Sequence, residues 1–281
     1  METTITLPFV YDFTRALDRL SNEAMNSVDL STNSIRFPME EGNVVKLQAT
    51  GTTERPSFLL EGTLDEAQVE EVKSIFHFDR SLTDIQSHFM NTDLAPIFVE
   101  HVGTPIVRSF SLYGNVMRSI IHQQLNMSFA HTLTMRFVET FGSEIDGVWR
   151  FPSPEKIALL EIAQLREMQF STRKAEYMIG LSQEIAAGSL NLQKYKQMDD
   201  AEVKADLVMY RGIGPWTAQS FLMSGLGRPN VFPIADIGLQ NGLQRLWQMD
   251  KKPTKDEISL RFSDWSPYLS YAALYLWRSI E

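Results

Sequence analysis

The period of the hydrophobic pattern changes near residue 104, and this change constrains the fold of the 281-residue chain more than any other feature. Before that point, three segments alternate at least in part between apolar and polar residues, as half-buried strands do: 34–39, 44–49 and 57–61. Beyond it, apolar residues recur every three or four positions, which is typical of helices. The pattern therefore predicts an α+β protein, with a small antiparallel sheet and helices in residues 1–103 and a helical region in residues 104–281.

Capping signals mark where several helices begin. A short helix is expected over residues 12–20, and a second one from Thr63, because Thr63 and Glu66 have the spacing of a capping box. In the helical region, Asp199 with Glu202 gives the same signal. The apolar stripes after residue 104 predict about eight to ten helices.

Acidic residues are concentrated in the first region of the chain. The overall net charge is −9, but residues 1–103 hold 7 Lys/Arg and 17 Asp/Glu, a net of −10. Residues 104–281 hold 19 and 18, a net of +1. The overall charge therefore does not exclude a nucleic-acid partner, because the second region is balanced and leaves room for a local basic face.

The chain has no cysteine, which excludes disulfides, thiol nucleophiles, iron–sulfur clusters and cysteine zinc sites. Its longest apolar run, 271–277, is far shorter than the roughly 18 residues that a membrane span needs. The first residues lack a basic segment followed by an apolar one, so no signal peptide is expected. These features suit a cytoplasmic protein, or a nuclear one in a eukaryote, that is not secreted.

Residues 207–218, Leu-Val-Met-Tyr-Arg-Gly-Ile-Gly-Pro-Trp-Thr-Ala, predict two helices joined by a turn with two glycines. Gly212 and Gly214 permit positive φ and the close approach of a ligand to the backbone, and Pro215 suits the first turn of the second helix. The free N–H groups of a helix start attract phosphate. The turn could therefore hold a DNA backbone, although an ordinary helix–helix turn has the same pattern.

Asp236 follows the apolar residues 231–235 and precedes an expected helix over 237–247. This is the position of a helix N-cap, where N–H donors favour the charged form of a carboxylate. Two interpretations are open. Asp236 is either a plain cap, worth about 1 kcal/mol, or a carboxylate in apolar surroundings that stabilises a cationic transition state.

Four segments resemble the helix–hairpin–helix DNA glycosylases, and among them the AlkA-type 3-methyladenine DNA glycosylase II group. Residues 207–218 are similar to the family hairpin and 231–236 to its catalytic-aspartate segment, while 120–126 resembles the segment inserted into the duplex and 265–277 the closing helix. The acidic first region is similar to the extra domain of AlkA-type members. The resemblance covers most of the chain and implies two helical lobes with an active-site cleft between them.

The resemblance implies a monofunctional DNA glycosylase of base excision repair. It would flip an alkylated base, of the 3-methyladenine or 7-methylguanine type, out of double-stranded DNA and hydrolyse the N-glycosidic bond. Asp236 would be the catalytic residue that stabilises the oxocarbenium-like state and orients the attacking water. Bifunctional members carry a lysine where this chain has Trp216, so no lyase step is expected. Trp216 and Tyr268 would bind the base by stacking.

The resemblance also implies contacts to DNA. Gln124 would fill the space left by the flipped nucleotide, beside Leu125 and Asn126. Phosphates would be bound by Gly212, Gly214 and Thr217, and by Lys174, for which a solvated helix face is an equal alternative. No cofactor is required for the chemistry, but a Na⁺ or K⁺ ion would bind at the hairpin through the main-chain carbonyls of Val208, Tyr210 and Ile213.

Several alternatives stay open. A non-catalytic helix–hairpin–helix DNA-binding protein would need the hairpin but neither Asp236 nor an aromatic pocket. Trp216 disfavours a bifunctional glycosylase, and five scattered histidines without ligand spacing disfavour a metal-dependent hydrolase. Ser220 and Leu269 depart from the aromatic residue and the arginine common in the family, which leaves the base preference open. A monomer without an obligate protein partner is expected. For the Trp277 side chain, packing in the core is favoured over a place in the pocket.

Overall fold

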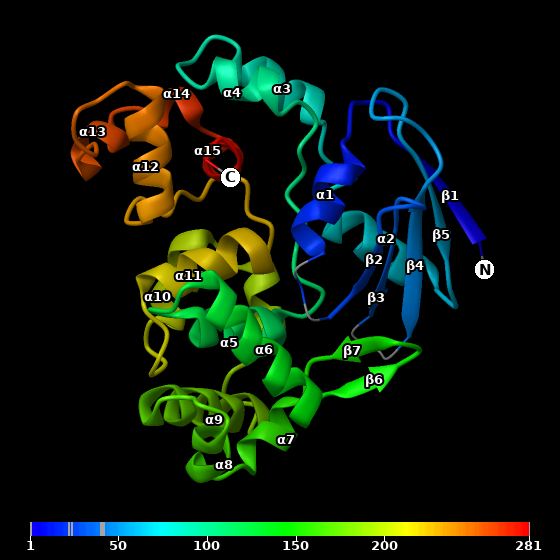
Figure 1. Cartoon of the computed structure of the whole chain (residues 1–281), viewed down its shortest axis with the longest axis vertical. Helices are drawn as coiled ribbons and strands as arrows, with labels where there is room; N and C mark the ends of the chain where they lie inside the picture. Colours follow the sequence, from blue (N-terminus) through cyan, green and yellow to red (C-terminus); the bar gives the residue numbers. More distant parts are fainter. Residues whose placement is uncertain (1, 22, 24, 40–42, 281) are drawn as a thin grey trace.

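The computed structural model describes residues 2–21, 23, 25–39 and 43–280. A five-stranded antiparallel sheet lies at one side of the molecule, and helices make up most of the rest (Figure 1). The predicted fold class, α+β with an N-terminal antiparallel sheet followed by a helical region, is confirmed. Within the described ranges, no helix is long and apolar enough to cross a membrane.

The sheet has the strand order β1-β5-β4-β3-β2, and all neighbours are antiparallel. Its strands are β1 Glu2–Thr6, β2 Ser27–Asp29, β3 Ser34–Pro38, β4 Val44–Ala49 and β5 Ser57–Glu61. The three predicted strands are confirmed as β3, β4 and β5, and alternation explains them, since Val45 and Leu47 of β4 are buried. The edge strands carry weaker patterns: β1 buries only Ile5, and β2 has three residues.

Four helices accompany the sheet: α1 Phe13–Leu20, α2 Glu66–Ile75, α3 Leu82–Phe89 and α4 Ala95–Glu100. α1 starts where expected, with Asp12 as its N-cap. The predicted start of α2 is wrong, because the capping box consists of Asp65 and Gln68 rather than Thr63 and Glu66. The two signals overlap in the sequence, and aspartate is a stronger N-cap than threonine.

Between residues 104 and 280 the chain forms eleven α-helices, more than the eight to ten expected, because some predicted stripes divide into short helices. Their bounds are α5 Leu112–His122, α6 Met127–Phe141, α7 Pro154–Ala158, α8 Ile162–Glu167, α9 Thr172–Ala186, α10 Asp200–Leu207, α11 Pro215–Ser220, α12 Ile237–Leu246, α13 Lys255–Ser259, α14 Phe262–Trp265 and α15 Leu269–Arg278. A 3₁₀ helix, η1 Leu192–Gln197, precedes α10, and a π-helical turn, η2 Phe221–Gly225, continues α11. The capping box of Asp199 and Glu202 is confirmed at the start of α10.

A β-hairpin interrupts the region predicted to be helical. β6 Ser143–Ile145 pairs with β7 Val148–Arg150 through a turn at Asp146 and Gly147, whose φ angles are 50° and 75°. The hairpin lies under the ends of the sheet strands in Figure 1, and β7 contacts β3. The helical region therefore contains a second, two-stranded sheet that the hydrophobic pattern did not predict.

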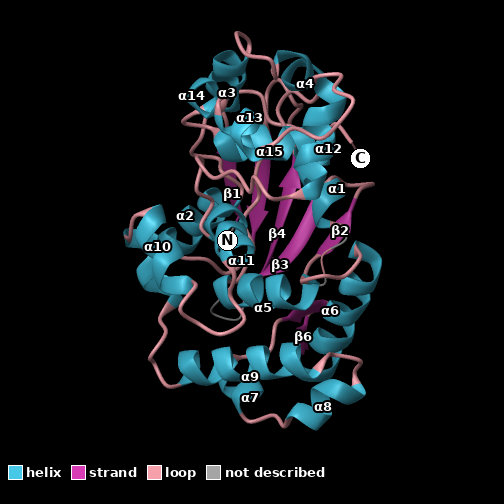
Figure 2. Cartoon of the chain, turned by 90° about the vertical axis from the view of Figure 1, so that its left-hand side faces the viewer, coloured by secondary structure: helices cyan, strands magenta, loops and turns pink. Residues whose placement is uncertain are grey.

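The helices form groups along the long axis of the molecule. α7, α8 and α9 lie at one end, and α12 to α15 lie at the other together with α3 and α4 (Figures 1 and 2). α4 contacts α15, so residues from before position 104 pack against the last helix of the chain. The division at residues 103 and 104 stays a prediction.

Buried polar contacts join the sheet region to the helices. Arg108, almost fully buried, donates to the Gly225 carbonyl at 3.0 Å and to the Ser74 hydroxyl at 2.7 Å. Nδ1 of buried His77, which follows α2, lies within hydrogen-bond distance of the Tyr271 hydroxyl of α15, at 3.2 Å. Because these contacts link α2 and the segment after it to η2 and α15, the sheet region is held against helices of the second region.

Candidate active site

One cleft of about 1770 Å³ brings together most of the predicted site residues. It is lined by the α5–α6 loop, the turn between α10 and α11, the start of α12, one face of α15 and the segment around the end of α1. The predicted residues that line it are Gln124, Leu125, Gly212, Ile213, Gly214, Trp216, Thr217 and Asp236. Segments more than 100 residues apart in the sequence thus contribute to a single site.

Asp236 is the N-cap of α12 and is partly exposed to the cleft. Its Oδ1 accepts two hydrogen bonds, from the Leu239 N–H at 3.0 Å and from the Trp277 Nε1–H at 3.0 Å. Among the described residues, both hydrogen-bond donors bind Oδ1, so Oδ2 is available to a ligand. Neutral donors thus orient the carboxylate without using all of its acceptor capacity.

Gly238 makes room for the contact between Asp236 and Trp277. A Cβ at this position would lie 3.0 Å from Asp236 Oδ1 and 3.3 Å from two atoms of the Trp277 indole. Core packing, the interpretation favoured from sequence for Trp277, is wrong in part, because the indole also lines the cleft. Leu274, Trp277 and Arg278 all line it, and their helical spacing along α15 is the signal that could have identified this face.

The turn between α10 and α11, with these two helices, forms the predicted helix–hairpin–helix unit and is called the hairpin from here on. Its two glycines have different roles. Gly212 has a φ of +97°, and a Cβ there would lie 2.5 Å from Cγ of the Tyr177 ring. Gly214 has a φ of −94° and is the N-cap of α11, with no other atom within 4 Å of where a Cβ would lie. Only Gly212 uses the positive φ that glycine permits, whereas Gly214 leaves open space in front of a helix start.

Gln123 connects the α5–α6 loop to the hairpin, a role that the sequence did not indicate. Its Nε2 donates to the Gly212 carbonyl at 2.9 Å and to the Thr217 hydroxyl at 3.0 Å. Thr217 is almost fully buried, so its hydroxyl serves this internal network instead of pointing outward as a phosphate ligand would. The network fixes the position of the loop that carries Gln124 relative to the hairpin.

The loop residues predicted to meet DNA differ in exposure. Gln124 is exposed at a φ of +55° and lines the cleft together with the half-buried Leu125. The structure does not bring Asn126 to the cleft lining, because its side chain caps α6 by accepting from the Phe129 N–H at 2.9 Å. Met127, which sequence reasoning passed over, is 73% exposed and lines the cleft beside them.

Trp216 lines the cleft and is 40% exposed, a large exposure for an indole. Tyr268 is not among the lining residues, because its ring packs edge-on against His88 of α3, with ring centroids 5.2 Å apart. Lys174 is also outside the lining: its Nζ donates to the Ile121 carbonyl at 2.6 Å, and burial lowers the pKa of its amine. The amine of Lys174, a residue of α9, therefore binds a carbonyl in the last turn of α5 and does not line the cleft.

The three carbonyls predicted to bind a monovalent cation belong to the turn between α10 and α11. Val208 is the C-cap of α10, and the Tyr210 carbonyl accepts from the Ile213 N–H at 3.0 Å. A carbonyl oxygen has two lone pairs, so this bond leaves acceptor capacity for an ion. No group of three or more His, Asp or Glu side chains that could hold a metal occurs among the described residues.

A charged pair lies in another part of the cleft wall. Arg118 of α5 forms an ion pair with Glu23, which follows α1. Burial alone would raise the pKa of the Glu23 carboxyl, but Arg118, with a smaller effect of Arg19, holds it below its ordinary value. Burial, together with Arg118, lowers the pKa of His122 to about 4, so this ring is neutral at neutral pH.

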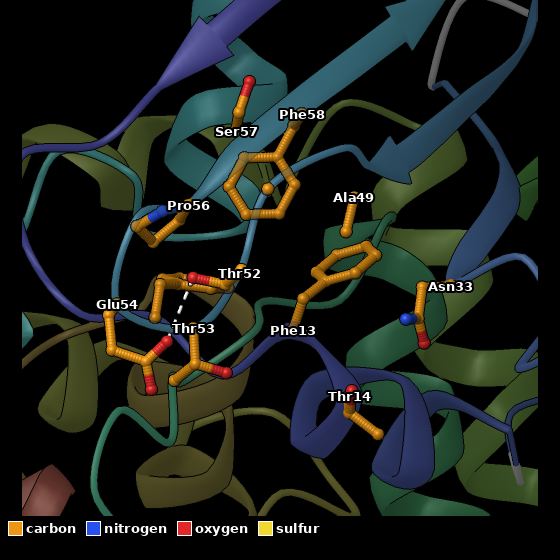
Figure 3. Close-up of a pocket in the computed structure, with 12 residues that line it drawn as sticks. Phe13, Thr14, Asn33, Ala49, Thr52, Thr53, Glu54, Pro56, Ser57 and Phe58 are labelled. Atoms are coloured by element: carbon orange, nitrogen blue, oxygen red, sulfur yellow. Dashed lines mark hydrogen bonds between the residues drawn. The ribbon is translucent and has the colours of Figure 1, made fainter.

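A second, smaller pocket of about 280 Å³ lies in the sheet region (Figure 3). Hydroxyl groups of Thr52, Thr53 and Ser57 surround it, and the rings of Phe13 and Phe58 form part of its wall (Figure 3). It shares no lining residue with the cleft that contains Asp236. This pocket is therefore separate from the candidate active site.

Comparisons with known proteins agree with the geometry. The family "HhH-GPD superfamily base excision DNA repair protein" matches residues 117–267. A Bacillus subtilis (strain 168) relative named "Putative DNA-3-methyladenine glycosylase YfjP" is 50% identical over 285 residues, covering 100% of this chain and 99% of its own. A second Bacillus subtilis relative, named "DNA-3-methyladenine glycosylase", is 31% identical and covers 98% and 95%.

The fold also matches solved structures. A structure titled "3-methyladenine dna-glycosylase from Archaeoglobus fulgidus" superposes with a TM-score of 0.81 at 23% identity, covering 98% of this chain and 97% of the other. The match spans both the sheet region and the helices, so the whole architecture is shared. The resemblance to the AlkA-like glycosylases is confirmed, and the chain belongs to the HhH-GPD superfamily of base excision DNA repair proteins.

Proposed function

We propose that the protein is a monofunctional DNA glycosylase that excises alkylated bases, of the 3-methyladenine and 7-methylguanine type, from double-stranded DNA. The observation that carries the proposal is the setting of Asp236, a carboxylate oriented by Trp277 and a helix start with one oxygen left for the cleft. The names of the two Bacillus subtilis relatives support the same substrate class.

The chemistry follows from the charge that develops on the sugar. As the base departs, the deoxyribose becomes oxocarbenium-like, and a preorganised carboxylate stabilises this charge. Because two donors hold Oδ1 of Asp236, Oδ2 would be the oxygen that faces the reacting carbon or receives a proton from the attacking water. The target nucleotide must leave the stack to reach this point, and the cleft is large enough to hold a flipped nucleotide.

Trp216 supports a hydrolytic route without lyase chemistry. It occupies the position two residues after Gly214 and presents an exposed indole to the cleft instead of an amine. An alkylated purine carries a positive charge, which an electron-rich ring attracts. Incubation with damaged duplex and borohydride should therefore trap no covalent adduct, and the abasic strand should stay intact until alkali is added. A trapped protein–DNA species would contradict the monofunctional assignment.

DNA would be held by the hairpin and the α5–α6 loop. Gly214 leaves space for a phosphate at the start of α11, and a Na⁺ or K⁺ ion on the carbonyls of Val208, Tyr210 and Ile213 would bridge to the same strand. Gln124 and Leu125 would enter the duplex where the nucleotide leaves. We propose that the protein acts as a monomer and that its chemistry requires no cofactor.

The test is single-turnover release of bases from methylated DNA, resolved by chromatography. Asp236→Asn should slow excision by about a hundredfold to a thousandfold, because such electrostatic contributions are worth several kcal/mol. Asp65→Asn is the matched control, since Asp65 caps α2 in the same way but lies outside the cleft. Asparagine caps a helix as well as aspartate does, so a purely capping role would leave both variants with wild-type excision.

The alternative of a non-catalytic DNA-binding protein gives a different result. Wild-type protein would then bind duplex DNA and release no base from any methylated substrate. Near-normal excision by Asp236→Asn would instead retain a glycosylase and remove Asp236 from its mechanism.

A further inference from the structure

The ion pair between Glu23 and Arg118 is the strongest feature of the cleft that the proposed chemistry does not use. Both side chains are 19% exposed and both line the cleft that contains Asp236 and Trp216. Glu23 comes from the segment after α1 in the sheet region, and Arg118 comes from α5, the helix that leads into the DNA-facing loop. The pair therefore connects the two regions of the chain at the site itself.

A structural role alone does not explain this placement. Taking two charges out of water is costly, and a buried ion pair is often no more stabilising than apolar residues of similar size. The junction between the regions is already held by Arg108, which bonds Ser74, and by the contact between His77 and Tyr271. A charged pair in the wall of a ligand cleft is better explained by what it offers to the ligand.

The hydrogen-bonding capacity of the pair is only partly used. Within the described residues, Arg118 contacts Glu23 through Nη1 and the Ser109 hydroxyl through Nη2 at 3.5 Å. A guanidinium has five N–H donors and a carboxylate has about four acceptor sites, so both groups keep capacity for a ligand. Side by side, they present a donor next to an acceptor.

An edge with the complementary pattern occurs on purine bases. Hypoxanthine and 7-methylguanine carry the N1–H donor beside the O6 acceptor, and adenine derivatives carry the same pair of groups in reverse. Glu23 also balances the charge of Arg118, so the pair itself does not repel a cationic alkylpurine. Neutral His122, one turn further along α5, adds a polar side chain without adding charge.

We propose that Glu23 and Arg118 are specificity-determining residues that read the donor–acceptor edge of the flipped purine. The inference rests on the proposed glycosylase function and deepens it, because it gives the acidic sheet region a direct part in substrate choice. Asp236 would supply the chemistry, Trp216 the stacking surface, and the pair would distinguish bases by their hydrogen-bonding edge.

The test compares two bases that differ only in this edge. Duplexes of one sequence carry either hypoxanthine or unsubstituted purine, which lacks both O6 and the N1–H. The variant Glu23→Leu/Arg118→Met removes both charges together, so neither is left buried without a partner. We expect the ratio of single-turnover excision rates, hypoxanthine over purine, to fall by about tenfold to a hundredfold, as for the loss of hydrogen bonds to charged groups.

Lys46→Met/Glu61→Leu is the matched control. This pair joins β4 to β5 at 2.8 Å outside the cleft, so its loss should leave the ratio unchanged. A ratio that stays constant in the Glu23/Arg118 variant, or equal losses on both substrates, would overturn the proposal and leave only a structural role for the pair. The same holds if the wild type excises neither base while it releases alkylated bases from methylated DNA. Failure of the proposed function looks different, since no base would then be released from any substrate.

Discussion

The two walls of the cleft are built in different ways. On one wall, the hairpin and the start of α12 place Gly214 and Asp236 by local sequence signals, a glycine turn and an N-cap. On the other, Glu23 and Arg118 meet across 95 residues of sequence, and neither has a local signal. In the proposed function, the first wall would serve the steps that every substrate shares, which are holding DNA and breaking the bond, whereas the second would distinguish one substrate from another.

Asp236 and Glu23, two of the carboxylates that line the cleft, show the same contrast. Asp236 is held by neutral donors on one oxygen, while Glu23 is held by a guanidinium that keeps its pKa low. A carboxylate with a free oxygen and no cationic partner can stabilise a new positive charge. One that is already paired is better suited to orient its partner. Variants that weaken each wall separately can test this difference.

The largest effect should come from Gly212, the glycine on which the hairpin fold depends. Gly212→Ala places a Cβ 2.5 Å from the Tyr177 ring at a φ of +97°. We expect a loss of about 2–4 kcal/mol in the free energy of unfolding, from steric overlap and backbone strain together. Gly214→Ala is the control, since nothing lies within 4 Å of its Cβ and its φ is ordinary. Equal denaturant midpoints for the two variants would show that the hairpin tolerates both changes.

A smaller effect is expected at the hydrogen bond that orients Asp236. Trp277→Phe removes the Nε1–H donor and keeps most of the ring. Excision should slow by about tenfold to a hundredfold, as when one bond to a charged group is lost. Trp247→Phe is matched, because Trp247 Nε1 also donates to an aspartate, Asp93, at 2.7 Å outside the cleft. If both variants excise at the wild-type rate, the carboxylate does not need the indole.

Elements with a local sequence signal could be predicted, whereas elements that depend on distant contacts could not. Local signals predicted β3 to β5, the turn at Gly212 and Gly214, and the N-cap at Asp236. The β6–β7 hairpin also has a local signal, since an Asp-Gly pair strongly favours a two-residue turn. It was not predicted because the segments on either side have helical periodicity.

Other features of the site depend on tertiary contacts. Gln123 reaches the hairpin across 89 positions, and Trp277 reaches Asp236 across 41. No periodicity specifies which buried polar partner a side chain will find. Tyr268 is the opposite case, because the sequence placed it in the cleft and the structure does not. Its place in the closing segment suggested the cleft, but the ring packs against His88 of α3, a helix that the pattern did not predict.

The hairpin wall can be tested further through DNA binding. Gly214→Asp places a negative charge where the helix start is open, so binding should weaken by about tenfold for damaged and undamaged DNA alike. Each neutralised phosphate contributes about −0.9 to the slope of log K against log salt. We expect about two to four Lys/Arg contacts to phosphates, and therefore a modest slope. A steep slope in the wild type, or unchanged binding by Gly214→Asp, would show that the hairpin is not the main anchor.

The smallest effect concerns the wall that carries Glu23 and Arg118, and the pH dependence of folding. Burial lowers the pKa of His122 from 6.5 to about 4, so the unfolded chain binds this proton more readily than the folded one. Stability is therefore fully present above pH 6.5 and falls as the pH drops toward 4. At pH 5.5 the loss from this residue should be about 1 kcal/mol. Buried His77, whose pKa burial also lowers, acts in the same direction.

His122→Gln separates the contribution of the cleft from that of His77. Glutamine can still bond the Thr134 hydroxyl, which lies 3.1 Å from His122 Nε2, but it does not titrate. Urea unfolding at pH 7.5 and pH 5.5 should show a smaller drop in the variant than in the wild type, by about 1 kcal/mol. An equal drop would mean that His122 is protonated in the folded state at pH 5.5. Arg118 would then have a cationic neighbour one turn along α5, and Glu23 would face two cationic side chains of that helix instead of one.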